Sequence, residues 1–121
     1  MMPVDLRVRI RRGNKEIEII ARANTAFSPE KDLPMINITL KDWEKLGRPE
    51  PEGYIPVRPY AQRSELYAHA FKVHVKVIAK DRESNWAEAY AIIHPEVKRR
   101  LLNDSILERL NIVIVKPRRG L

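Results

Sequence analysis

Apolar and polar residues alternate along much of this chain with a period of two. One such run lies near the start, where charged residues separate four apolar ones: Val4, Leu6, Val8 and Ile10. Such alternation is typical of a half-buried β-strand. It resumes after Gly13-Asn14 and continues to Ala21, so residues 1–23 predict a β-hairpin with its turn at Arg12 to Lys15.

Further strands are predicted in the rest of the chain. The strand-like stretches occupy residues 33–40, 67–79, 86–93 and 112–115. One more short strand is expected around Ile55 to Val57, inside a proline-rich connection that otherwise favours irregular backbone.

Two segments have helical spacing. Residues 41–47 predict a short helix that is closed by Gly47 and buries Trp43 and Leu46. The apolar residues from Val97 to Leu110 predict a second helix, with a break or cap at Asn103-Asp104-Ser105. The whole order predicts a mainly β fold with one or two short helices.

Length and composition narrow the class of protein. The 121 residues suit a single domain, with a core over about residues 4–115 and a basic tail at 116–121. The chain has no cysteine and no apolar run long enough to span a bilayer, so we expect a cytoplasmic protein without membrane attachment. Its composition, with nine prolines and 32% charged residues, is typical of proteins from thermophiles.

The segment from Ala21 to Ser28 reads Ala-Arg-Ala-Asn-Thr-Ala-Phe-Ser and directly follows the predicted hairpin. With the apolar stretch and short helix ending in Leu46-Gly47, and with Leu101-Leu102-Asn103 near the end, it resembles the retropepsin-like aspartic proteases. The resemblance is to their small single-lobe members, which act as homodimers with one catalytic aspartate from each subunit. It implies an acid-protease β-barrel.

The motif departs from the family at the positions that matter for chemistry. Where the family has Asp-Thr-Gly, this chain has Asn24, Thr25 and Ala26, followed after one residue by Ser28. Aspartic-protease chemistry needs two carboxylates that share a proton, and an amide cannot act as a base. Ala26 also lacks the backbone freedom of glycine. We therefore predict a degenerate member without proteolytic activity, in which these four residues mark the former catalytic turn.

The resemblance also implies a role for the inactive domain. A cleft between the two subunits would be floored by Asn24 and covered by a hairpin near Val73 to Trp86, and it would bind extended peptides or a partner protein by strand-like pairing. The plainer alternative is that Ala21 to Ser28 is an ordinary exit from a strand into a turn.

A second function class is nucleic-acid binding. The formal net charge is +7, and basic residues project from two predicted strands: Arg7, Arg9, Arg11, Lys72 and Lys76. Two such strand faces brought together could track a phosphate backbone, and four tyrosines could stack on bases: Tyr54, Tyr60, Tyr67 and Tyr90. Basic residues on exposed strands also serve solubility.

No cofactor or metal is predicted. His69 and His74 fall on opposite faces of one predicted strand, unlike a pair of metal ligands, and His94 lies apart from them. The four glycines are isolated, so no glycine-rich phosphate loop is present.

Overall fold

The computed structural model describes residues 4–23, 33–57, 66–94 and 98–112 of the chain. Within these residues, seven strands and two helices follow in the order β1 (Val4–Arg12), β2 (Lys15–Ala23), β3 (Met35–Asn37), α1 (Leu40–Lys45), β4 (Gly53–Val57), β5 (Leu66–Val77), β6 (Ala87–Ile93), β7 (Leu101–Leu102) and α2 (Asp104–Arg109). The predicted mainly β architecture with two short helices is confirmed.

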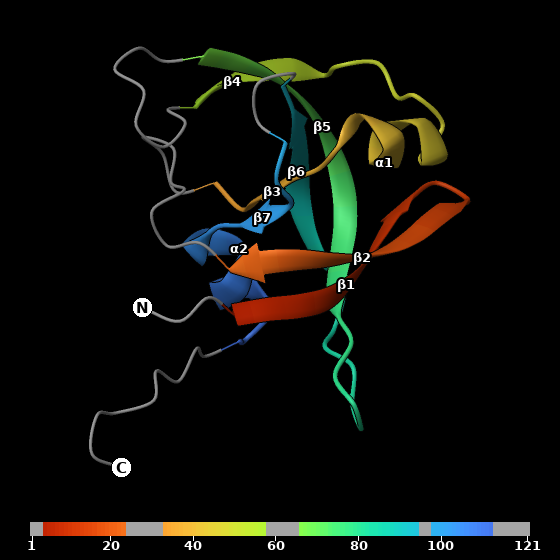
Figure 1. The fold of residues 1–121 in the computed structure, drawn as a ribbon, viewed down its shortest axis with the longest axis vertical. Coiled ribbons are helices and arrows are strands. Elements are labelled where there is room, and N and C mark those ends of the chain that lie inside the picture. The colour runs from red at the N-terminus through yellow and green to blue at the C-terminus, as the bar shows by residue number, and fades with distance from the viewer. Residues whose placement is uncertain (1–3, 24–32, 58–65, 95–97, 113–121) are drawn as a thin grey trace.

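The strands form one sheet that closes on itself. Their order is β1-β2-β7-β3-β6-β5-β4. An additional pairing of β1 with β5 closes the strands from β1 to β5 in this order into a ring. The result is a six-stranded barrel with β4 attached outside it as the edge strand. Figure 1 shows the β1–β2 hairpin crossing the long, curved β5.

The N-terminal hairpin agrees with the sequence prediction. β1 and β2 pair antiparallel along their whole length, from Val4 opposite Ala23 to Arg12 opposite Lys15. The turn is Gly13-Asn14, and Gly13 has a φ of 62°, a conformation that glycine adopts without steric cost. Alternate residues of both strands, such as Val8 and Ile10, are buried in the barrel.

Strand β5 changes its partner along one edge. Residues 74–77 pair with β1, whereas residues 66–70 pair with β4. Between the two pairings, a carboxylate oxygen of Glu52 accepts a hydrogen bond from the backbone N–H of Lys72. The Glu52 backbone N–H in turn donates to the Ala70 carbonyl at 2.8 Å. The side chain of Glu52 therefore satisfies a backbone donor that neither neighbouring strand reaches.

Apolar side chains fill both faces of the central strands. The main core lies inside the barrel and includes Ile36, Ala91 and Leu102. A second cluster contains their chain neighbours Met35, Ile92 and Leu101, together with Ile55, Ala68 and Ala70. Consecutive residues reach different clusters because successive side chains of a strand point to opposite faces. This explains why β3, β6 and β7 contain adjacent apolar residues.

The helices differ from the sequence prediction in extent. α1 begins after Thr39, whose side chain caps the Asp42 N–H while the Asp42 side chain caps the Thr39 N–H. The expected strand over residues 33–40 shrinks to β3 because this capping box ends it. The predicted helix from Val97 to Leu110 was wrong in its first half, since Leu101–Leu102 is strand β7 and only Asp104–Arg109 is helical. Residues 95–97, 113–115 of the predicted last strand and the basic tail lie outside the described residues.

Candidate functional site

The four residues of the degenerate motif, Asn24, Thr25, Ala26 and Ser28, lie outside the residues that the structure describes. The strand that leads to them, β2, is described as far as Ala23. β2 ends at Ala23 and pairs in parallel with β7, with Arg22 opposite Leu101 and Ala23 opposite Leu102. The Arg22 N–H donates to the Arg100 carbonyl at 2.9 Å. The chain thus enters the motif beside Leu102-Asn103, the other segment that carried the resemblance.

Asn103 joins three elements at this point and is fully buried. Its Oδ1 accepts hydrogen bonds from the backbone N–H of Met35 at 3.0 Å and of Ile106 at 3.1 Å. Its Nδ2 donates to the Leu33 carbonyl at 2.7 Å. One amide therefore caps α2 and holds the start of β3 against β7. The sequence predicted the cap, but nothing in the local pattern indicated the contacts with Leu33 and Met35.

A buried ion pair ties α1 to the same region. The Arg100 guanidinium donates from Nε and Nη2 to the two carboxylate oxygens of Asp42, each at 2.8 Å, and the Asp42 side chain is only 1% exposed. Burial by itself would raise the pKa of Asp42, but hydrogen bonds from Arg100 and from Thr39 outweigh it and lower that pKa below its usual value. The same pairing raises the pKa of Arg100. Sequence reasoning missed this pair because 58 residues separate its members.

A shallow hollow of about 440 Å³ lies next to this ion pair. Its lining combines exposed apolar and basic side chains, including Ile20, Arg22, Lys98 and Arg99. Arg22 is paired with Asp5 at 3.0 Å. The surface beside the exit of β2 is therefore basic and partly apolar.

The hairpin of β4 and β5 carries exposed aromatic residues. Tyr54 and Tyr67 are 60% and 65% exposed. Tyr54 lies opposite His69 in the strand register, and the two rings meet edge to face with centroids 5.1 Å apart. In Figure 1 this hairpin lies at one end of the molecule, and the turn between β5 and β6 lies at the other.

The hairpin expected to cover a cleft, near Val73 to Trp86, begins in the wall of the barrel. Val73 and Val75 are 2% and 0% exposed because they belong to the main core. This part of β5, paired with β6 from Val75 opposite Ala87 onward, is wall of the barrel. The rest of this hairpin, from Ile78 to Trp86, lies beyond the pairing of β5 with β6 and forms the turn that extends away from the barrel in Figure 1.

The structure does bring together the two basic strand faces. Arg9 lies opposite Lys76, and Arg11 lies opposite His74. Most of these cations are already paired. The three shortest contacts are Arg9–Glu18 at 3.1 Å, Arg7–Glu18 at 3.7 Å and Lys76–Glu83 at 2.7 Å. The hydrogen bond from Lys76 lowers the pKa of Glu83. Arg11 and Lys72 make no such pair within the described part of the chain.

The two exposed tyrosines, Tyr54 and Tyr67, do not lie among these cations. Tyr67 and Lys76 are nine residues apart on β5, which corresponds to about 30 Å along an extended strand. Tyr90 lies opposite Lys72 in the strand register, but it is partly buried and packs against the second cluster. Tyr60 lies outside the described residues. The exposed aromatic rings and the basic strand faces are therefore separate surfaces.

Comparison with protein-family models and with curated proteins found no match, so the site is interpreted from its geometry alone. In the regions that the structure describes, no group of three or more His, Asp or Glu residues is arranged to hold a metal ion. Neither described helix has the length and apolar character needed to cross a membrane.

Proposed function

We propose that this chain is a retropepsin-like domain without proteolytic activity that binds extended peptides or a partner protein. The observation that carries the proposal is the parallel pairing of β2 with β7. The two segments that resemble the protease family, one leading into Asn24 and one at Leu101-Leu102-Asn103, are about 80 residues apart in the sequence but lie side by side at the exit of β2. The closed barrel around this pairing supports the family assignment.

The expected loss of activity follows from the residue at the former catalytic position. An asparagine amide can donate and accept hydrogen bonds, but it has no proton to share and cannot activate water. Two such amides across a dimer axis would keep a polar floor without a base. Binding is the function that this change leaves intact.

The β4–β5 hairpin offers a suitable surface for an extended peptide. β4 is the edge strand of the sheet and pairs, among the described strands, only with β5. An edge strand presents unpaired backbone groups to which a peptide can add as another strand. The exposed Tyr54 and Tyr67 beside it provide apolar contact area with polar tips.

A protease assay tests the chemical half of this proposal. Purified protein should cleave neither denatured protein nor unstructured peptides between about pH 3 and 8, since no carboxylate stands at position 24. Asn24→Asp alone should remain inactive because Ala26 and Arg22 still depart from the family motif. Pepstatin-sensitive cleavage by the wild type would refute the proposal.

A binding assay tests the other half. Fluorescence anisotropy with a library of unstructured peptides should identify ligands whose affinity falls when Tyr54 or Tyr67 is changed to Ser. The comparison variant is Tyr90→Ser, which alters a partly buried tyrosine that packs against the second apolar cluster. Equal losses in all three variants would assign the effect to folding and contradict a peptide site at this hairpin.

Nucleic-acid binding remains the second candidate, and the register that joins Arg9 to Lys76 favours it. The ion pairs of Arg7, Arg9 and Lys76 with glutamates weaken it, because each pair must be broken or shared before a phosphate is bound. Titration of duplex DNA at several salt concentrations distinguishes nucleic-acid binding from the proposed peptide binding. Each neutralised phosphate adds about 0.9 to the log-log salt slope, and tight binding abolished by Arg9→Glu with Lys76→Glu would put this candidate first.

A further inference from the structure

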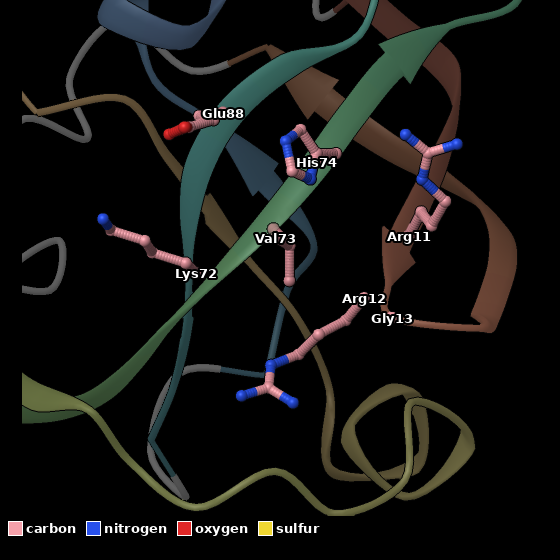
Figure 2. A pocket seen from close by; sticks show the side chains of 7 residues that line it. All are labelled: Arg11, Arg12, Gly13, Lys72, Val73, His74 and Glu88. Atoms are coloured by element: carbon pink, nitrogen blue, oxygen red, sulfur yellow. The ribbon is translucent and has the colours of Figure 1, made fainter.

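A hollow of about 310 Å³ opens where β1 and β5 part from each other. Their pairing ends at Arg11 opposite His74, after which β1 turns into β2 and β5 continues towards β4. The hollow is lined by residues of the β1–β2 turn, of β5 and of β6: Arg11, Arg12, Gly13, Lys72, Val73, His74 and Glu88. Figure 2 shows the charged side chains and His74 spread around Val73.

The charge of this hollow is not balanced. Its lining contains three permanent cations, Arg11, Arg12 and Lys72, and one carboxylate, Glu88. Within the described part of the chain none of these three cations forms an ion pair with a carboxylate. The neighbouring cations Arg9 and Lys76 are paired with Glu18 and Glu83. The three unpaired cations of this region therefore line one hollow.

Aromatic rings hold the two guanidinium groups. The Arg11 guanidinium carbon lies 4.2 Å from the ring centroid of Trp86, and that of Arg12 lies 5.8 Å from the ring centroid of Phe71. A guanidinium that stacks on a ring uses its flat face and keeps its in-plane N–H donors available for an anion. Stacking also restricts the side chains in advance, which lowers the entropy cost of binding.

We propose that this hollow binds a compact, multiply charged anion of the phosphate type, such as pyrophosphate or a phosphate ester. The cations come from the end of β1 and from β5, the two strands that border the hollow, so a ligand with more than one charged oxygen group can contact more than one of them. The ion pairs at Arg9–Glu18 and Lys76–Glu83 bound the positive region, so a long polyanion finds no continuous basic track along the strands. A small ligand therefore fits the charge pattern better than nucleic acid.

Glu88 and His74 affect which anions the site favours. They lie opposite each other on β6 and β5, and both line the hollow. The Glu88 carboxylate repels an anion, so it disfavours the most highly charged ligands. His74 adds a ring N–H that can donate to a phosphate oxygen. This site is next to the proposed peptide surface but uses different residues, because the pairing of β4 with β5 ends at Ala70 and the hollow is lined by β5 from Lys72 onward.

Isothermal titration calorimetry with pyrophosphate, orthophosphate and citrate on the full chain tests the site. Wild type should bind pyrophosphate more tightly than orthophosphate, and citrate tests whether carboxylates serve equally well. Arg12→Gln with Lys72→Gln should weaken pyrophosphate binding about tenfold or more, since charge-assisted hydrogen bonds are lost. The control Lys41→Gln with Lys80→Gln removes the same charge from exposed residues outside the hollow and should leave affinity unchanged.

A third variant tests the site without removing any of its cations. Glu88→Gln should tighten pyrophosphate binding several-fold, because it removes the only carboxylate of the lining while the exposed side chain keeps its shape. Three results would overturn the site: no pyrophosphate binding by the wild type, an equal loss in the control double variant, or Glu88→Gln binding no better than wild type. Tight duplex DNA binding that depends on Arg7 and Arg9 would favour nucleic acid instead.

Discussion

At the scale of single residues, Asn103 contributes most to the structure around the exit of β2. Its amide makes three hydrogen bonds in a fully buried position, two of them to the start of β3 and one to the first turn of α2. Asn103→Ala should lower the free energy of unfolding by about 2–4 kcal/mol, because it removes a helix cap and leaves buried backbone groups unsatisfied. Urea unfolding followed by circular dichroism measures this.

Asn85→Ala is the matched control for Asn103. Asn85 is exposed in the turn between β5 and β6. Removal of its amide should change the free energy of unfolding by less than about 0.5 kcal/mol. If Asn103→Ala were as mild as this control, the three hydrogen bonds would not be important for the region around the exit of β2.

At the scale of elements, the Asp42–Arg100 pair joins α1 to the chain just before β7. The pKa of Asp42 is lower in the folded protein than in the unfolded chain, so the pair stabilises the fold above the unfolded pKa of about 4. This stabilisation is lost as the pH falls through the folded-state pKa. Asp42→Asn should cost about 2–3 kcal/mol at neutral pH, less than for a fully buried pair because Arg100 is 35% exposed.

Unfolding experiments at several pH values measure the expected convergence. The difference between wild type and Asp42→Asn should be largest near pH 7 and should shrink towards the most acidic conditions, where the wild-type carboxylate is also neutral. Asp81→Asn, in an exposed turn, is the control and should show no comparable difference at pH 7. A gap that stayed constant with pH would mean that the ion pair contributes nothing to stability.

The elements also show what could be predicted from the sequence. β1 and β2 alternate cleanly because one face of the hairpin is buried and the other is charged, and both strands were predicted with the correct turn. β7 was assigned to a helix because Leu101 has helical spacing with Val97 and with the apolar residues from Ile106 to Leu110. A strand buried on both faces has no alternation to reveal it. The hollow beside Arg12 could not be predicted, since it depends on where β1 and β5 separate.

At the scale of the whole molecule, the proposed relationship to single-lobe proteases predicts a homodimer. Such domains complete their cleft only by pairing, and β4 leaves an edge of the sheet without a described partner strand. Analytical ultracentrifugation should show a dimer at micromolar concentration. A chain that stayed monomeric at much higher concentration would count against the retropepsin-like assignment, while the barrel itself and the anion site would be unaffected.

Trp86 gives the protein a built-in optical reporter. Its ring contacts the Arg11 guanidinium at 4.2 Å and the Lys76 ammonium at 4.7 Å, so it is flanked by two positive charges. The chain's other tryptophan, Trp43, donates its ring N–H to the Pro49 carbonyl on α1's side of the molecule. An indole's emission responds to charge close to its ring, so a ligand that draws Arg11 towards itself will change the fluorescence of Trp86 and leave that of Trp43 alone. Occupancy of the hollow can thus be followed without attaching a dye.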